Sequence, residues 1–212
     1  MEQLTFEDMG RDFGAEKGSG AWTERERQYL YWLSQAPAIG AVTIKKLWDR
    51  CRSFETVYNM EETALSRMGL LKQNQAADLG SWKSCLGRCR EEYGVLQEKG
   101  IRLVTFLDEE YPGRLKPLYD RPAVLYGIGR FPDEERPAAA IVGARDCSHY
   151  GRETAEALGR VLAEAGIQVI SGMALGIDGA GHRGCLKGGG DTYAVLGCGV
   201  DICYPRNHFS MY

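Results

Sequence analysis

Three short glycine-containing segments each follow a predicted strand in the second half of the chain, and they hold the residues best suited to chemistry. The first segment, residues 143–151, contains Gly143, Arg145, Ser148, Tyr150 and Gly151. An arginine, a hydroxyl and the free N–H groups at a helix N-terminus are donors that bind a phosphate group. The same residues also suit a tight turn between strand and helix that leaves the arginine in solvent. The segment therefore indicates either a phosphate site or a simple connection.

The second segment, residues 171–178, contains Ser171, Gly172, Gly176 and Asp178, and His182 follows one helical turn later. Glycines lack a Cβ atom and let a ligand or another backbone approach closely. Asp178 can cap the next helix, and the spacing of four residues lets it meet His182. The pair could perform acid–base chemistry, but no nucleophile stands out nearby. We therefore favour a role in bracing the loop.

The third segment, residues 197–201, places Cys198 between two glycines. A cysteine there could be a nucleophile, but a small buried side chain is the more common use of such a residue. Lys187, at the end of the second predicted helix, could add a phosphate contact or only complement the helix dipole. Cys85 and Cys89 have the wrong spacing for common zinc sites and no second pair nearby, so we expect no metal site.

Two common nucleotide-binding motifs are absent from these segments. The sequence has no Gly-Lys-Ser or Gly-Lys-Thr as in a Walker A loop, and the glycines at 143 and 151 do not fit G-x-G-x-x-G. ATP hydrolysis and nicotinamide redox chemistry are therefore poorly supported, and we expect no cofactor. The residues indicate a binding protein rather than an enzyme.

The composition is that of an ordinary globular protein, with 44% hydrophobic and 26% charged residues among 212. The net charge of −3 excludes a strongly basic, histone-like DNA binder but is compatible with a local basic site. No apolar run approaches the roughly 18 residues of a membrane helix. The polar N-terminus lacks the apolar core of a secretion signal, and the seven cysteines are an odd number. We expect a cytoplasmic protein without disulfide bonds and without a membrane partner.

Two regions precede the segments described above. Residues 1–21 are polar and contain four glycines, and we expect them to be a flexible tail. Residues 22–86 have helical periodicity and predict a small all-α domain. Its first helix starts with Thr23 as N-cap and Glu26 as capping-box partner.

A weak DNA-binding motif lies within the predicted helical domain. Residues 38–47 resemble a helix-hairpin-helix, in which a glycine turn offers backbone N–H groups to DNA phosphate. Val42 stands where the motif usually has its second glycine, while Lys45 and Lys46 supply positive charge. The motif could contact DNA, but packing is the simpler interpretation.

Residues 87–212 predict a domain that changes to an α/β pattern. Short strands are predicted at 101–106 and 124–126, followed by strands at 138–142, 167–170 and 192–196 that alternate with helices at 151–165 and 177–186. This last alternation predicts a parallel, doubly wound sheet. The carboxyl ends of its strands share one edge, so we expect the three glycine-containing segments to lie together there. Three strands make about half of a typical doubly wound domain, so we expect the domain to be truncated in its C-terminal half.

Several strings resemble the DprA/Smf family, the bacterial DNA-processing protein A. They are I-V-G-A-R from residue 141, S-G-M-A-L-G-I-D-G-A-G-H from residue 171, and Y-P from residue 204. The S-G-x-A-x-G-I-D-x-x-x-H run is the specific part, and the resemblance covers roughly residues 25–212. Ala144 stands where the family usually has serine, and Gly181 where it usually has alanine.

The resemblance implies a sterile-alpha-motif-like N-terminal domain and an extended Rossmann-like domain. It implies a protein that protects incoming single-stranded DNA, loads RecA recombinase in natural transformation, and forms a homodimer at full length. It maps the phosphate pocket onto Arg145, Gly143, Ser148, Ser171 and Gly172, and less directly onto Lys187. Tyr150 and Gly151 belong to the matching strings and are further candidate contacts. We expect base stacking to contribute little, because Tyr150 and Tyr204 are the main aromatics near this edge.

Two other functions remain open. Related Rossmann-like folds include phosphoribohydrolases that cleave a base from a ribose phosphate. Their P-G-G-x-G-T-x-x-E motif is absent, because residues 188–190 lack the following threonine and glutamate. The chain could also be a protein-interaction scaffold that acts through its helical domain. Base release from nucleoside monophosphates would identify the first alternative, and capture of RecA without DNA would identify the second.

Overall fold

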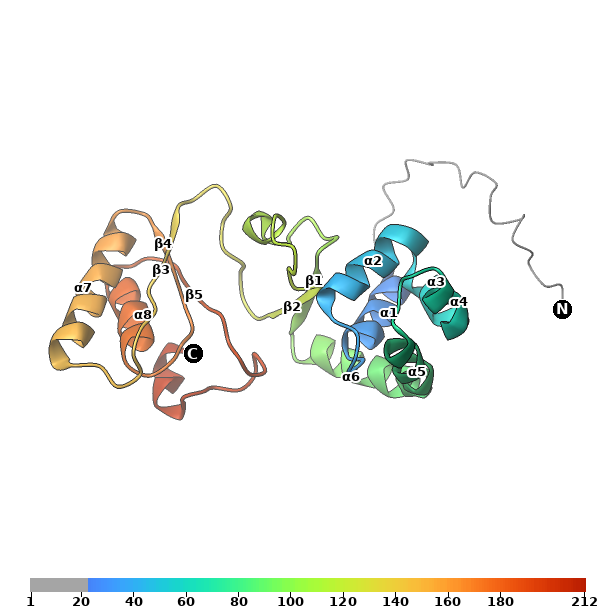
Figure 1. Ribbon diagram of the computed structural model, residues 1–212. Helices are drawn as coiled ribbons and strands as arrows, with labels where there is room; N and C mark the ends of the chain where they lie inside the picture. Colours follow the sequence, from blue (N-terminus) through green and yellow to red (C-terminus); the bar gives the residue numbers. More distant parts are fainter. Residues whose placement is uncertain (1–22) are drawn as a thin grey trace.

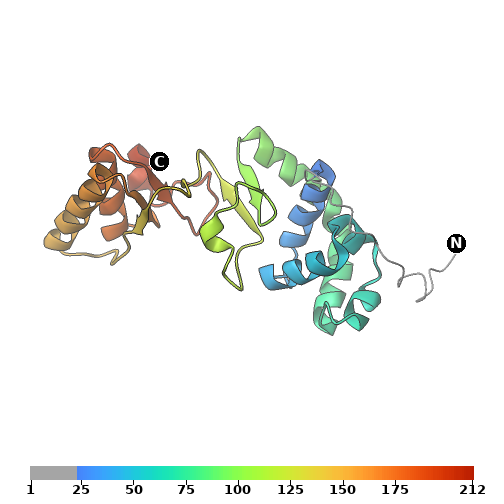
Figure 2. The same ribbon diagram turned by 90° about the horizontal axis from the view of Figure 1, so that it is seen from above.

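The computed structural model describes residues 23–212, so the predicted tail and Trp22 lie outside the described residues. Three parts follow one another in space as they do in sequence: a helical part, a two-stranded ribbon and an α/β part (Figure 1 and Figure 2). Among the described residues, no helix combines the length and the apolar character needed to cross a membrane.

Short helices build the N-terminal part, in agreement with the helical periodicity of residues 22–86. They are α1 (Glu24–Ser34), α2 (Ala41–Cys51), α3 (Phe54–Asn59), α4 (Glu62–Arg67), α5 (Gln73–Trp82), the 3-10 helix η2 (Lys83–Cys85) and α6 (Leu86–Glu98). The apolar residues at helical spacing form a common core, in which Leu30, Trp32 and Leu47 have no exposed surface. This burial stabilises helices that are too short to persist alone.

The predicted capping box at the start of α1 forms only in part. The Thr23 side chain accepts a hydrogen bond from the Glu26 backbone N–H, as expected for an N-cap. The Glu26 carboxylate instead accepts bonds from the Phe54 backbone N–H at 2.7 Å and the Ser53 hydroxyl at 2.6 Å. Glu26 therefore stabilises the N-terminus of α3, because that terminus offers two donors in a tertiary contact that local spacing does not reveal.

The ribbon packs against the helices rather than against the second sheet. Strands β1 (Arg102–Thr105) and β2 (Val124–Gly127) pair antiparallel, with Val104 opposite Leu125, and the short η3 (Gly113–Leu115) lies between them in sequence. Leu103 belongs to the same buried core as Leu86 and Cys89 of α6. The hydrophobic core of the helical part therefore continues across the domain boundary predicted at residue 86.

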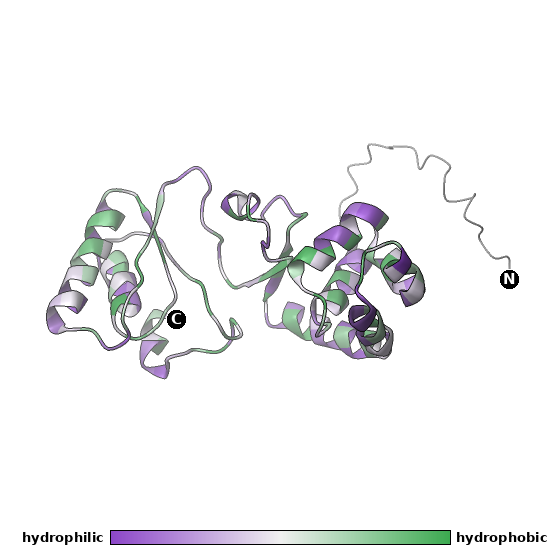
Figure 3. Ribbon diagram, viewed as in Figure 1, coloured by the Kyte–Doolittle hydropathy of each residue, from purple (hydrophilic) through white to green (hydrophobic). Residues whose placement is uncertain are grey.

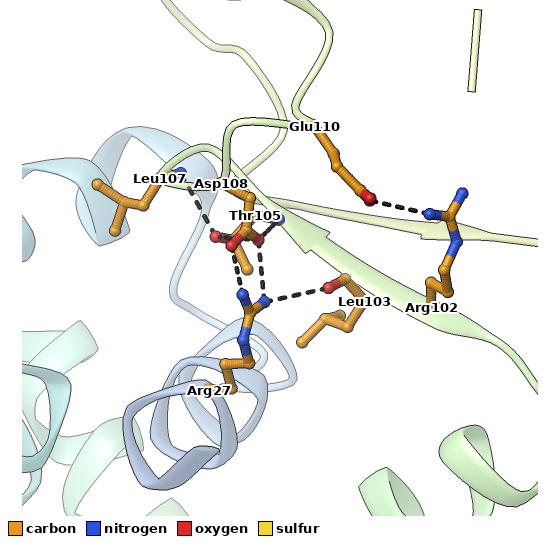
Figure 4. Close-up of polar contacts among 7 residues, drawn as sticks. All are labelled: Arg27, Arg102, Leu103, Thr105, Leu107, Asp108 and Glu110. Carbon is orange, nitrogen blue, oxygen red and sulfur yellow. Dashed lines mark hydrogen bonds and ion pairs between the residues drawn. The ribbon is translucent and has the colours of Figure 1, made fainter. Parts of the chain in front are cut away.

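A charged contact joins α1 to the ribbon (Figure 4). Arg27 of α1 donates two hydrogen bonds to the Asp108 carboxylate, one of them 2.9 Å long. Asp108 also accepts from the backbone N–H of Thr105 at 2.7 Å and from its hydroxyl at 2.9 Å. The Asp108 contact raises the pKa of the Arg27 guanidinium further. The partly buried pair therefore fixes the turn after β1 against α1.

The α/β part has the predicted parallel sheet, but its two helices among the described residues cover one face, so the predicted doubly wound arrangement is not seen there. Its elements are β3 (Ala138–Ala140), α7 (His149–Glu164), β4 (Gln168–Ser171), α8 (Ile177–Lys187), β5 (Thr192–Ala194) and the 3-10 helix η4 (Arg206–Met211). The strand order is β3-β4-β5, with both pairs parallel. Consecutive right-handed crossovers place both helices on the same face of such a sheet, and Figure 1 shows α7 and α8 on the same side of the strands.

The two outer strands are each two residues shorter than predicted, and side-chain bonding explains this at β3. The Ile141 N–H still pairs with Ile170, but the Ile141 carbonyl accepts from the Ser171 hydroxyl and the Gly143 N–H donates to Asp178. Backbone groups that bond to side chains cannot extend a strand ladder. The backbone groups after β3 therefore bond to side chains of the second segment and do not extend the sheet.

Helices α7 and α8 pack closely through small residues. A Cβ atom at Gly184 would lie 1.9 Å from the Glu156 carbonyl oxygen, so only glycine fits there. Figure 3 shows both hydrophobic and hydrophilic stretches along α7, whose buried residues are the small Ala155, Gly159 and Ala163. The small core beneath them includes Ile141, Val169 and Ala180.

Candidate functional site

The carboxyl ends of β3, β4 and β5 meet at one edge of the parallel sheet, here named the carboxyl edge. It comprises residues 141–151, 171–178 and 194–208, which include the three segments singled out in the sequence. The Ile177 N–H donates to the Ala144 carbonyl at 3.2 Å, so the first two segments touch. Open α/β sheets bind ligands at this edge.

Asp178 ties the ends of β3 and β4 together. Its carboxylate is 6% exposed and accepts hydrogen bonds from the Gly143 and Gly172 backbone N–H groups, both at 3.1 Å. A Cβ atom at Gly172 would lie 2.8 Å from the same carboxylate. The N–H groups of both glycines are thus already bonded to an acid and are not free donors for a phosphate.

Gly176 brings the second segment against the backbone of the first. Its φ of +76° lies in the left-handed region that favours glycine. A Cβ atom there would lie 2.2 Å from the Ala144 carbonyl oxygen and 2.5 Å from that of Arg145. The close approach predicted for the glycines is therefore real at this position, but the neighbour is protein backbone rather than a ligand.

The two candidate serines have different surroundings. Ser171 is 3% exposed, and its hydroxyl donates to the Ile141 carbonyl at 2.5 Å, so it holds two strand ends together inside the protein. Ser148 is exposed and caps α7, because its hydroxyl oxygen accepts from the Gly151 N–H at 3.1 Å. Ser148 faces solvent at the carboxyl edge, whereas Ser171 does not.

The exposed donors gather at the start of α7. Arg145 is exposed and has no hydrogen bond or ion pair among the described residues. Tyr150 is 78% exposed in the first turn of α7, where the leading N–H groups of a helix point outward. An exposed guanidinium and the outward N–H groups of a helix N-terminus each attract an anion.

His182 does not bond to Asp178, although one helical turn separates them. Its Nδ1 lies 2.6 Å from the Thr192 hydroxyl, which itself donates to the Val169 carbonyl at 3.0 Å. The hydroxyl must therefore accept, so Nδ1 carries the proton. Burial lowers the pKa of His182, while the nearby Asp178 carboxylate raises it and His208 lowers it. His182 thus joins α8 to β5 as a neutral, buried side chain.

Lys187 lies away from the carboxyl edge. It ends α8, whose 11 residues carry it roughly 15 Å from the first turn. Its ammonium group pairs with the Glu156 carboxylate of α7 and lowers the pKa of that acid. The structure therefore does not bring Lys187 together with Arg145, because a helix that starts at one edge of a sheet ends at the other.

The remaining candidates are dispersed. Cys198 is exposed, which corrects the expectation of a small buried residue, because the loop after β5 turns outward to solvent. In the helix-hairpin-helix-like stretch, Gly40 is the N-cap of α2. Lys45 forms an ion pair with Asp49 at 2.5 Å, and Lys46 is exposed. The described residues contain no group of three metal-binding side chains.

Sequence reasoning missed His208, which supports the second segment. It is 5% exposed, and its Nδ1 lies 2.9 Å from the Met173 carbonyl oxygen. Met173 has a φ of +59°, uncommon for a residue other than glycine. The sequence carried no periodic or spacing signal for this contact, because the two residues meet only through the tertiary fold.

A cavity of about 630 Å³ lies elsewhere, between α1, α6 and β1. Acidic and basic residues both line it, and its two arginines, Arg27 and Arg102, are paired with Asp108 and Glu110. This cavity offers no unpaired cation to a phosphate, which distinguishes it from the carboxyl edge.

Comparisons with known proteins agree on one group of relatives. The family model described as DNA recombination-mediator protein A matches residues 102–212. Protein Smf of Synechocystis is 30% identical over 193 residues, which cover 87% of this chain and 48% of the relative. The putative DNA processing protein DprA of Mycobacterium tuberculosis is 37% identical over 139 residues, covering 59% of this chain and 36% of the relative. The chain thus spans about half or less of these relatives.

A solved structure shares the fold. The X-ray structure of DNA processing protein A from Streptococcus pneumoniae superposes with a TM-score of 0.69 at 25% identity, covering 87% of this chain and 62% of that one. The likeness extends over both the helical and the α/β parts, because it covers more of the chain than either part alone. The relatives from Mycobacterium tuberculosis and Streptococcus pneumoniae are described as DNA processing proteins, which agrees with the prediction of a protein that is not an enzyme and does not favour the nucleotide-cleaving alternative.

Proposed function

Because the chain belongs to the DNA recombination-mediator protein A family, known as DprA/Smf, we propose that it binds single-stranded DNA at the carboxyl edge of its parallel sheet. The membership agrees with the resemblance of the sequence strings. One observation carries the proposal: Arg145 is an exposed cation without a partner among the described residues, in the loop that leads into the Ser148 N-cap of α7. Its planar guanidinium suits a backbone phosphate.

Each candidate site residue has a proposed part. Arg145 binds a phosphate, the Ser148 hydroxyl donates a second bond, and the exposed Tyr150 ring stacks on a base. Five residues act behind this surface by holding the loops in place: Gly143, Ser171, Gly172, Gly176 and Asp178. Gly151 permits the tight capped turn that starts α7. His182 braces α8 on β5, and Lys187 supports the contact with α7 rather than the DNA contact.

The wider role follows from the family. We propose a sterile-alpha-motif-like domain over residues 22–86 and an extended Rossmann-like domain over residues 87–212, the latter carrying the DNA site. In this proposal the protein acts in the cytoplasm, forms a homodimer at full length, protects incoming single strands and loads RecA onto them in natural transformation. The chain spans 48% of the Synechocystis relative, so these wider activities belong to the proposal and need tests of their own.

Fluorescence anisotropy with a labelled oligo-dT tests the DNA site. We expect Arg145→Ala to weaken binding about tenfold or more, because a hydrogen bond to a charged group contributes about 1.5–3 kcal/mol. Arg160→Ala is the matched control, since this exposed arginine lies near the far end of the same helix and pairs with Glu164. Absence of binding by the parent chain, or equal binding by the two variants, would refute the proposed site.

A further inference from the structure

The loop between β4 and α8 depends on a contact from the C-terminal segment. Met173 occupies the left-handed region with a φ of +59°, a conformation that costs free energy in any residue with a Cβ atom. Such a conformation persists only where surrounding contacts stabilise it. The contacts of the loop therefore show which residues stabilise the conformation of Met173.

His208 makes one of these contacts from outside the β4–α8 unit. It lies in η4, is 5% exposed and places its Nδ1 2.9 Å from the Met173 carbonyl oxygen. A carbonyl oxygen only accepts, so His208 Nδ1 is the donor. The adjacent Cε1–Nε2 edge of the ring lies against α8, where a Cβ atom at Gly179 would be 2.4 Å from His208 Cε1. The ring is therefore held between the loop and the first turn of the helix.

The loop between β4 and α8 packs against the segment that carries the exposed Arg145. Within the β4–α8 unit, the Gly179 N–H donates to the Ala174 carbonyl at 3.0 Å, and the loop ends at Gly176. Gly176 packs against the backbone carbonyls of Ala144 and Arg145. A change at Met173 would shift Gly176, and Gly176 cannot shift without moving the backbone that carries the Arg145 side chain.

We propose that His208 is a positioning residue for the carboxyl edge: its Nδ1–H holds the Met173 carbonyl, and this contact sets where the loop places the Arg145 backbone. The proposal rests on the proposed function, because it assigns His208 to the single-stranded DNA site. His208 itself does not touch DNA, since it is buried behind the loop.

A pair of variants of similar size separates hydrogen bonding from packing. Asparagine places an amide N–H donor near the position of Nδ1, whereas ionised aspartate has only acceptors. We expect His208→Asp to weaken oligo-dT binding about tenfold, and His208→Asn to stay within about threefold of the parent, because the lost bond costs more when its acceptor stays buried.

A second substitution tests the route through Met173. Glycine adopts the left-handed conformation without strain, so Met173→Gly reduces the dependence of the loop on His208. We expect this change to restore most of the DNA binding that His208→Asp loses. A variant that only lowers overall stability would not be rescued in this way, and thermal unfolding of each variant measures that stability.

Amide hydrogen exchange over residues 172–180 gives a readout without DNA. The proposal expects faster exchange in His208→Asp and nearly unchanged exchange in His208→Asn. Faster exchange with undiminished DNA binding, while Arg145→Ala still weakens binding, would overturn the positioning role and leave the proposed function standing. A parent chain that binds no DNA would overturn both the proposed function and the assignment of His208 to a DNA site. Equal effects of asparagine and aspartate would also overturn the proposal.

Discussion

At the scale of single residues, the carboxyl edge divides into side chains that face solvent and side chains that hold the loops. Arg145 and Tyr150 are exposed, whereas Ser171, Asp178 and His182 are nearly buried and bonded to the protein itself. Residue types at strand ends did not distinguish the two groups, because a serine hydroxyl suits a phosphate site and a loop brace equally well. Burial makes the distinction.

The Asp178 carboxylate should be essential for stability. It accepts two backbone N–H bonds in a nearly buried position, and in Asp178→Asn the amide group would face at least one of these donors. We expect the variant to lose about 1.5–3 kcal/mol of unfolding free energy, the range for a hydrogen bond to a charged group. Urea unfolding measures the loss, and a change below about 1 kcal/mol would contradict the bridging role.

His182 should make stability fall in mild acid. Burial lowers its pKa below the ordinary value of a histidine, so the unfolded chain binds a proton more readily than the folded one. The stability from neutral His182 is complete above the unfolded pKa near roughly 6.5, and it is lost as pH falls from there through the lowered folded pKa.

Asparagine at this position tests the effect, because His182→Asn keeps a donor for Thr192 but does not titrate. We expect the difference in urea midpoint between the parent and this variant to shrink between about pH 7 and pH 5.5, where a histidine of ordinary pKa gains its charge. Parallel curves over that range would show that His182 does not control the acid response.

At the scale of elements, the order of strands and helices in the α/β part was predictable. The apolar runs, the glycines after each strand and the helical spacing between them all indicated the same parallel sheet. The helices of the N-terminal part were predicted for the same reason. Secondary structure was predictable here because the residues within each helix or strand also determine its type.

Contacts between distant elements were not predictable from the pattern. Nothing local shows that Glu26 caps α3, that residues 101–106 pair with 124–126 in a separate ribbon, or that His208 meets Met173. The family resemblance implied Lys187, less directly, as a phosphate contact, whereas helix α8 carries this residue to the other end of the sheet. Such contacts depend on how whole elements pack.

Two glycines offer a matched test of how the loops meet. Gly176 and Gly189 both have positive φ, but a Cβ atom at Gly189 meets nothing within 4 Å, whereas at Gly176 it meets the Ala144 carbonyl oxygen at 2.2 Å. Gly189→Ala should cost only about 1–2 kcal/mol from the left-handed backbone. Gly176→Ala should cost clearly more and should weaken oligo-dT binding. Equal decreases in melting temperature for the two variants would show that the contact between Gly176 and the Ala144 carbonyl does not contribute to stability.

At the scale of the whole molecule, the contact between Arg27 and Asp108 should couple the helical part to the ribbon. Both side chains are largely buried, and Asp108 also holds the turn after β1. We expect Arg27→Ala to lower stability by about 3 kcal/mol, because an acid is left without its partner in a partly buried site. Calorimetry should show a lower and broader transition.

The control for this coupling lies two residues earlier on the same helix. Arg25 pairs with Glu55, but its side chain is 65% exposed, and exposed pairs contribute little. Arg25→Ala should leave the transition almost unchanged. A similar response from both variants would indicate a general effect of removing an arginine from α1 rather than coupling through Asp108.

The bridge that Asp178 makes has a consequence for affinity. Because the ends of β3 and β4 are joined by a carboxylate that is part of the chain, their spacing is set when the protein folds. In the proposed function, a strand of nucleic acid does not need to order these loops, so the conformational entropy of that ordering is not subtracted from the binding free energy. The backbone of these two strand ends is therefore preorganised before any ligand binds.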